Sequence, residues 1–161
     1  MPTQKVISTP YKLIDSDPHA SRVVSYMRPS DFAVWGGSTF AAPGALYLWE
    51  LAEPSRSAVK VPLRVAGVFG FVGGFLLAYQ RSSFRFWGWT ENEREAAMDL
   101  TELRARAQQG LPLYGQSDQP EWVQQAAHSN SAFSQLKFSA FPMLNLVNHP
   151  HHGTDESQYK Q

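Results

Sequence analysis

The sequence of 161 residues contains no cysteine. A disulfide framework, a thiolate nucleophile, cysteine-ligated zinc and an iron–sulfur cluster held by this chain are therefore excluded. An excess of either charge is also missing, because 14 Lys and Arg residues balance 14 Asp and Glu residues to a formal net charge of +0. A protein that binds nucleic acid through its phosphates would be more basic, so we expect no nucleic-acid partner.

Ionisable side chains are absent from two long windows. One is residues 32–49 (FAVWGGSTFAAPGALYLW), and the other is residues 65–80 (VAGVFGFVGGFLLAYQ). Extending the second window back past Arg64 to Val61 gives about the 20 residues that a helix needs to cross a bilayer. The windows predict two membrane spans, at about 32–50 and 61–81. The alternative is a pair of buried helices or strands in a soluble core.

The flanks of the windows favour the membrane. Aromatic residues and arginines, which belong at a bilayer interface, lie near the ends of both windows: Trp35, Tyr47 and Trp49 at the first, and Tyr79, Arg81, Phe84, Arg85, Phe86, Trp87 and Trp89 at the second. A short polar loop, LAEPSRSAVKVP, separates the windows and fits a helical hairpin. Slightly more basic residues lie on the side of the termini, which predicts both termini on the inner side of the membrane.

Small residues recur inside both predicted spans. Residues at every fourth position of the first span are Ala33, Gly37, Ala41 and Ala45, and the second span carries Ala66, Gly67, Gly70 and Gly74. Such stripes allow helix backbones to approach closely in lipid, so we expect the spans to pack through them. Pro43 lies inside the first span and predicts a kink there.

The polar remainder has few apolar residues from which to build a core. Thr90 and Glu93 match a capping box that begins a helix ending near Gly110 and Pro112. The apolar face of this helix is thin, consisting of Ala96, Leu100, Leu103 and Ala107. A shorter helix is expected from Pro120 to about Phe138, and residues 141–161 are expected to be extended.

These observations predict an all-α membrane protein without an independent globular core. Residues 1–30 form an N-terminal extended arm, residues 31–81 a transmembrane helical hairpin, and residues 82–161 a C-terminal helical and extended arm. A partner surface would cover the aromatic residues of the second arm, which are Trp122, Phe133, Phe138, Phe141 and Tyr159.

Histidines are the candidates for acid–base chemistry or metal ligation. Three cluster in NHPHHG as His149, His151 and His152, but no further ligand stands at the fixed spacing of a known zinc motif. We interpret this run as a polar turn near an exposed or interface-bound tail, with a metal site as the alternative. His19, beside Asp15 and Asp17, is either a general base or part of an Asx-type turn that leads into a helix starting around Pro18, and we favour the turn. We therefore expect no catalytic, cofactor-binding or metal-binding residue.

Several longer runs carry a family resemblance. DPHASRVV, RPSDF, YQRSS, GWTENERE and LPLYG resemble the fungal NUXM-type accessory subunits of mitochondrial NADH:ubiquinone oxidoreductase, respiratory complex I. The resemblance implies a two-helix subunit of the membrane arm in the mitochondrial inner membrane, without cofactor, catalytic residue or small-molecule substrate. It implies a role in assembly and stability, with core and accessory membrane-arm subunits and lipid as neighbours.

Two other functions stay open. One is an inner-membrane assembly factor that binds transiently, and the other is a free-standing membrane enzyme or metal protein that uses the histidine cluster. A separate hypothesis, which depends only on the interfacial position of these arginines, is that Arg64, Arg81 and Arg85 hold anionic lipid head groups such as cardiolipin.

Overall fold

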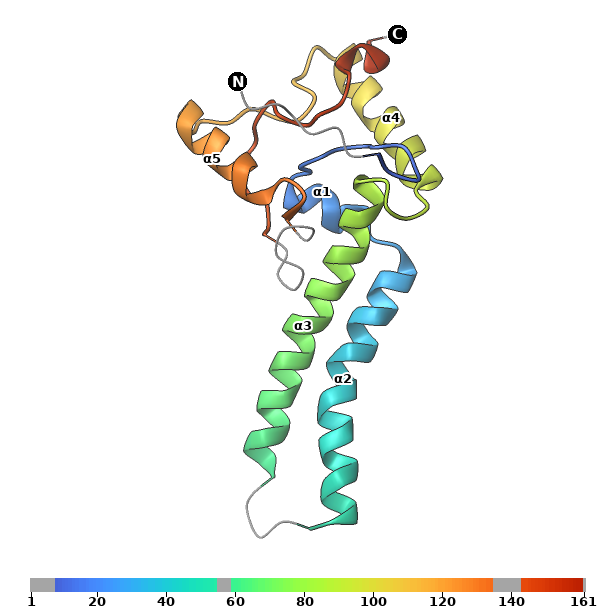
Figure 1. Cartoon of the computed structure of the whole chain (residues 1–161), viewed down its shortest axis with the longest axis vertical. Helices are drawn as coiled ribbons and strands as arrows, with labels where there is room; N and C mark the ends of the chain where they lie inside the picture. The colour runs from blue at the N-terminus through green and yellow to red at the C-terminus, as the bar shows by residue number, and fades with distance from the viewer. Residues whose placement is uncertain (1–7, 55–58, 135–142, 161) are drawn as a thin grey trace. The chain divides into compact units, whose positions relative to one another are not determined.

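A computed structural model describes residues 8–54, 59–134 and 143–160 (Figure 1). The helices are α1 (Ala20–Ser25), α2 (Pro29–Ala52), α3 (Lys60–Phe86), α4 (Glu93–Gln108), α5 (Glu121–Ser131) and the short 3-10 helix η1 (Glu156–Tyr159). No β-strand occurs among the described residues. The predicted all-α class is therefore confirmed for this part of the chain.

The chain divides into two compact units. We call Met27–Ser82 the hairpin unit, and Met1–Tyr26 together with Ser83–Gln161 the terminal unit. The chain passes from one unit to the other twice, between Tyr26 and Met27 and between Ser82 and Ser83. The second crossing lies within the last turns of α3.

In the hairpin unit, α2 and α3 run side by side (Figure 1). A Cβ atom at Gly70 would lie 2.8 Å from the carbonyl oxygens of Ser38 and Thr39, and one at Gly74 would lie 2.7 Å from that of Trp35. Such contacts are shorter than any side chain tolerates, so the two helices approach this closely because glycine has no Cβ. The prediction that Gly70 and Gly74 form a packing face is confirmed.

The predicted stripe on the first helix is wrong as a partner for the second. Nothing lies within 4 Å of a Cβ built at Gly37. Ala33, Ala41 and Ala45 share that face by their spacing, and all are exposed. α2 instead contacts α3 through Trp35, whose indole N–H donates to the carbonyl of Phe71 at 2.9 Å and whose ring packs against Phe71 and Phe75. A bulky ring thus fills the space beside the close approach, which four-residue spacing of small residues did not reveal.

Membrane-span character is unequal in the two helices. α3 is the one helix among the described residues that is both long enough and apolar enough to cross a membrane. α2 has 24 residues but is diluted by Ser, Thr, Gly and Pro, and it continues through Pro43 without a break in its helical assignment. The predicted first span at 32–50 therefore stays a prediction.

The terminal unit corrects the expectation of two separate arms. Its N-terminal segment pairs with the chain after α3, since Ile14 N–H donates to the Phe86 carbonyl at 2.9 Å and Tyr11 N–H to that of Gly88 at 3.1 Å. Ser16 N–H reaches the carbonyl of His152 at 2.9 Å near the other end of the sequence. Arms that each lack a core when taken alone bury one another because they are brought together in space.

α4 begins and ends close to the predicted positions, although its start differs in detail. Gly110, with φ +67°, follows the helix as expected. The cap residue is Asn92 rather than Thr90, and the Asn92 side chain donates to the carbonyls of Lys12 and Arg85 at 2.8 and 2.7 Å. The capping box prediction is therefore wrong, because the asparagine that precedes the helix ties the N-terminal segment to the end of α3.

The thin face of α4 packs within this chain. Leu103 is fully buried together with Leu113 and Tyr159, and Leu100, Ala107 and Tyr114 pack against them. The prediction that a partner covers Tyr159 is therefore wrong, because the residue is buried within this chain. Trp122 on α5, in contrast, is 72% exposed. α5 ends at Ser131, seven residues before the predicted end at Phe138. Phe138 and Phe141 lie outside the described residues.

Candidate functional site

The strongest concentration of ionisable side chains lies in the terminal unit. We call it the Asp–His cluster, and its members are Asp15, Asp17, His128, His149, His151 and His152. They come from three segments that are far apart in the sequence: the turn before α1, helix α5, and the run that follows residue 145.

The two aspartates are placed by the turn that the sequence predicted. Asp17 N–H donates to Asp15 Oδ1 at 2.9 Å, which is an Asx turn, and His19 then caps α1 by accepting from Ser21 N–H at 3.2 Å. The interpretation of His19 as part of a turn is thus confirmed, and its ring lies outside the cluster. The turn directs both carboxylates into the protein, where they are fully or almost fully buried.

Two histidines of NHPHHG meet these carboxylates. His149 Nε2 lies 2.8 Å from Asp17 Oδ2, and His152 Nδ1 lies 2.8 Å from Asp15 Oδ1. His149 and His152 are each only 4% exposed. The prediction of an exposed or interface-bound tail is therefore wrong for these two residues. Each histidine pairs with a carboxylate that is distant in the sequence, and local sequence patterns cannot predict such a partner.

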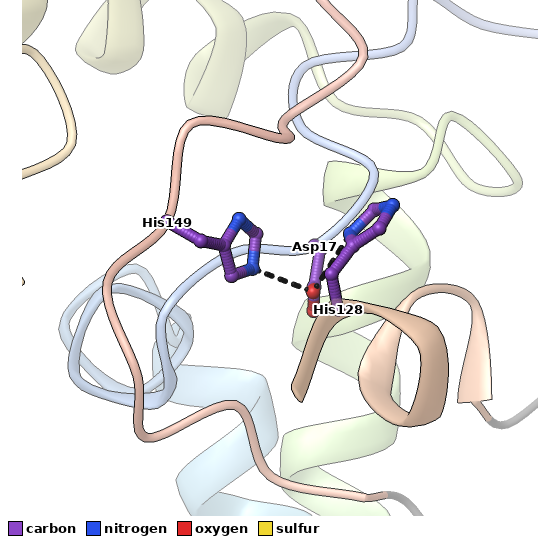
Figure 2. Close-up of side chains that lie close together, drawn as sticks. All are labelled: Asp17, His128 and His149. Carbon is purple, nitrogen blue, oxygen red and sulfur yellow. Dashed lines mark hydrogen bonds and ion pairs between the residues drawn. The ribbon is translucent and has the colours of Figure 1, made fainter. Parts of the chain in front are cut away.

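Helix α5 supplies the third side of the cluster, which sequence reasoning missed. His128 Nδ1 lies 3.2 Å from Asp17 Oδ2, and Ser131 Oγ donates to the same oxygen at 2.7 Å. The two residues stand three positions apart and so share one face of the helix. Figure 2 shows His128 and His149 approaching Asp17 from opposite sides. The sequence offered only this helical spacing as a signal, since nothing in it linked α5 to residue 17.

Hydrogen bonding keeps Asp17 ionised. Burial alone would raise the pKa of Asp17, but hydrogen bonds with His128, His149 and Ser131 outweigh it, and the pKa is lowered. His151 is affected differently, because burial and the neighbouring histidines lower the pKa of its imidazole. The cluster therefore combines an anionic carboxylate with an imidazole that is neutral at pH 7.

His152 links the cluster to Tyr114, which packs against the small apolar core. Its Nε2 lies 2.7 Å from the carbonyl of His149, and its ring stacks on Tyr114 with the centroids 3.6 Å apart. Oxygen acceptors face both ring nitrogens, since Asp15 lies at Nδ1. Arg22 Nη1 is 3.5 Å from the other oxygen of Asp15.

Arg22 connects the cluster to a second buried network. Arg22 Nη2 lies 2.8 Å from Asp99 Oδ1, and Tyr159 O–H donates to Asp99 Oδ2 at 2.7 Å. Burial raises the pKa of Asp99 against the opposing effects of Arg22 and Tyr159, and burial beside Asp99 raises the pKa of Tyr159. Helices α1, α4 and η1 are thus joined by buried polar contacts in addition to the small apolar core.

Two arginines expected at lipid head groups have protein partners. Arg85 is 4% exposed and its Nε lies 3.4 Å from Glu95 Oε1, so the expectation that Arg85 holds a lipid is wrong. Arg81 lies half exposed in the hairpin unit, with its Nε 3.1 Å from Asp31 Oδ1. Arg85 is buried because the terminal unit folds around it. Its position just after a predicted span could not predict this burial.

The atoms of Asp17, His128 and His149 suit a metal ion in type and number. One ligand atom from each lies within 4.8 Å of the others, and zinc accepts carboxylate oxygen and imidazole nitrogen. His149 Nδ1 accepts from His151 N–H at 3.1 Å, which places the ring proton of His149 on Nε2. A metal at Nε2 would shift that proton and break this hydrogen bond at a cost of about 1 kcal/mol.

Comparisons with known proteins identify the family. A sequence profile described as NADH-ubiquinone oxidoreductase complex I, 21 kDa subunit, matches residues 8–91, and a profile described as the C-terminal of NADH-ubiquinone oxidoreductase 21 kDa subunit matches residues 100–161. The NADH-ubiquinone oxidoreductase 20.9 kDa subunit of Neurospora crassa is 44% identical over 160 residues, covering 98% of this chain and 85% of the relative. The chain belongs to this complex I subunit family.

The family match covers both halves of the Asp–His cluster. Asp15 and Asp17 fall within the first matched segment, and the histidines of the cluster fall within the second. The resemblance seen in the sequence is thereby confirmed.

Proposed function

We propose that this chain is a non-catalytic accessory subunit of mitochondrial complex I, located in the membrane arm, where it supports assembly and stability of the NADH:ubiquinone oxidoreductase. The observation that carries this proposal is the 44% identity to the Neurospora subunit along almost the whole chain. Identity of this extent makes the same complex the expected host, with core and accessory membrane-arm subunits as partners. In this proposal the chain supplies no catalytic residue and no cofactor to the reaction.

The surface of the hairpin unit supports insertion of both helices into the inner membrane. Large apolar side chains are exposed along α2 and α3 alike, including Phe40 (75%), Leu48 (66%), Val68 (63%) and Phe69 (74%). A soluble protein rarely leaves so many in one region, because each exposed side chain forgoes burial worth about 1.5–3 kcal/mol. Lipid or neighbouring transmembrane helices would cover them, which gives a two-pass topology with both termini on the matrix side.

The exposed stripe of Ala33, Gly37, Ala41 and Ala45 supports a helix–helix contact outside this chain. Since Gly70 and Gly74 contact α2 through Trp35 and Ser38, the stripe is left for a neighbouring span of the host complex. Arg64 and Arg81, which are exposed at positions flanking the apolar stretch of α3, are proposed contacts for anionic head groups.

Comigration tests the proposal. Native membranes are solubilised in mild detergent, complexes are separated by size, and the chain is quantified by mass spectrometry. We expect the chain in a constant ratio to core subunits of a megadalton NADH-oxidising complex. A chain that migrates alone would contradict membership of the complex.

The second candidate, a transient assembly factor, shares the hairpin and the apolar surface. It predicts that the chain is found with incomplete intermediates and is depleted from the mature complex. The ratio of this chain to core subunits in mature and immature fractions therefore separates the two functions.

A further inference from the structure

We propose that Asp17, His128 and His149 form a binding site for one divalent transition metal ion, with zinc as the first candidate. The site lies within the terminal unit and does not depend on the hairpin. It would act as a structural staple, because it joins the turn before α1, helix α5 and the segment around residue 149 (Figure 2).

The charge of Asp17 provides the first argument. Its carboxylate is buried, and a buried carboxylate that ionises requires an opposite charge nearby. Asp15 has Arg22 within 3.5 Å. Within the described residues, the hydrogen-bond partners of the Asp17 carboxylate are His128, His149 and Ser131, and none of these carries a permanent positive charge. The counter-charge must be a proton on an imidazole or a bound cation.

The three ligand atoms lie close enough together to surround one cation of the zinc type, at distances that also suit hydrogen bonds. In a tetrahedral site with bonds of roughly 2.0–2.2 Å, neighbouring ligand atoms stand about 3.4 Å apart. Asp17 Oδ2 lies 2.8 Å from His149 Nε2 and 3.2 Å from His128 Nδ1. The two imidazole rings are 5.1 Å apart between centroids and nearly perpendicular, at 66°. Small side-chain shifts therefore place all three atoms around one ion.

The surroundings hold the ligands and leave an entrance. Ser131 donates to Asp17 Oδ2 and Asn145 Nδ2 donates to the Asp17 carbonyl, so the aspartate is fixed from two sides. The His128 side chain is 25% exposed, whereas those of Asp17 and His149 are at most 2% exposed. An ion would enter beside His128.

His151 is a neighbouring imidazole outside the group of three ligand atoms that lie within 4.8 Å of one another. Its ring centroid lies 5.3 Å from that of His128 and 5.9 Å from that of His149.

Metal content of variants tests the site. The assembly that contains this chain is purified through a tag on the chain itself, and zinc is counted per copy of the chain by elemental analysis. We expect His128→Gln and His149→Gln each to lower the content by one zinc per chain. His19→Gln is the matched control, because His19 lies outside the cluster, and its content should equal that of the wild type. Equal zinc in all four preparations would overturn the proposal and leave a proton as the counter-charge.

A second measurement needs no variant, in case the substitutions prevent folding. Wild-type assembly is stripped with a chelator, divided, and treated with diethyl pyrocarbonate with and without added zinc sulfate. We expect zinc to lower the modification of His128 at least fivefold while leaving that of His19 unchanged. Equal modification of His128 in both samples would overturn the site. Because both readouts concern metal at this chain, they stand apart from the comigration result that decides the proposed function.

Discussion

In the hairpin unit the large apolar side chains lie on the outside, whereas in the terminal unit charged side chains lie on the inside. Phe40 and Phe69 are each about three-quarters exposed on α2 and α3, while Asp15, Asp17 and Glu95 are almost completely buried in the terminal unit. The hairpin is held by close backbone packing at Gly70 and Gly74. The terminal unit is held by paired charges and hydrogen bonds around a small apolar core.

This difference shows that one chain uses two sources of stability. Close packing between helices stabilises them through van der Waals contacts and does not depend on the hydrophobic effect. It therefore suits the apolar surroundings proposed for the hairpin. Buried ion pairs specify which segments meet, but each becomes costly when one partner is removed. Disrupting each source should therefore affect its own unit and leave the other unchanged.

The largest effect is expected for Arg22→Met in the terminal unit. The change leaves Asp15 and Asp99 buried without their cation, which should lower the local free energy of unfolding by about 3–5 kcal/mol. Hydrogen exchange of α1 and α4 amides in the intact complex measures the loss. Lys160→Met is the control, because Lys160 and Glu156 form an exposed pair at 3.7 Å. Similar exchange in the two variants would contradict the role of the buried network.

A smaller effect is expected for Gly74→Ala in the hairpin unit. The new Cβ would meet the Trp35 carbonyl at 2.7 Å, so the helices must separate, at a cost of about 1–3 kcal/mol. The amount of chain recovered in the assembled complex should fall. Gly67→Ala is the matched control, since no atom of the described residues lies within 4 Å of its added Cβ. Normal recovery of Gly74→Ala would show that the close approach contributes little.

Removing one phenolic hydroxyl sharpens the comparison between the units. Tyr159→Phe removes a donor to the buried Asp99 and should cost about 1–2 kcal/mol in the terminal unit. Tyr47→Phe makes the same change at a half-exposed position of α2 and should stay within about 0.5 kcal/mol. Thermal unfolding followed by site-specific proteolysis of each unit compares them. Equal effects would contradict a stabilising role for the buried hydrogen bond between Tyr159 and Asp99.

The smallest effect expected is a dependence on acid pH through Asp17. Its pKa in the folded chain lies below the ordinary value of about 3.9, so ionised Asp17 stabilises the fold fully above about pH 5. That contribution is lost as the pH falls through the lowered native pKa. The protection factors of the α5 amides, which correct exchange rates for the direct effect of pH, should fall more between pH 6 and pH 3 in the wild type than in Asp17→Asn. A parallel fall in both would exclude Asp17 as the source of the pH dependence.

Sequence patterns predicted the local elements well because local forces specify them. The apolar windows coincide with α2 and α3, the glycine after α4 ends that helix, and Asp15 and Asp17 form the expected turn. The shared runs of residues also identified the family. Long-range partners could not be predicted, and the errors at Tyr159, Arg85 and His149 all arose because each residue pairs with a group distant in the sequence.

The sequence by itself determined the helices, the glycine face of α3 and the membership of a complex I subunit family, since periodicity, backbone freedom and shared motifs are properties of neighbouring residues. Only the tertiary structure decided that the two terminal segments form one unit and that Asp17 meets His128 and His149. The physical reason is that a buried carboxylate takes its partners from wherever the chain folds back. Separations of 111 and 132 residues leave no trace in local pattern.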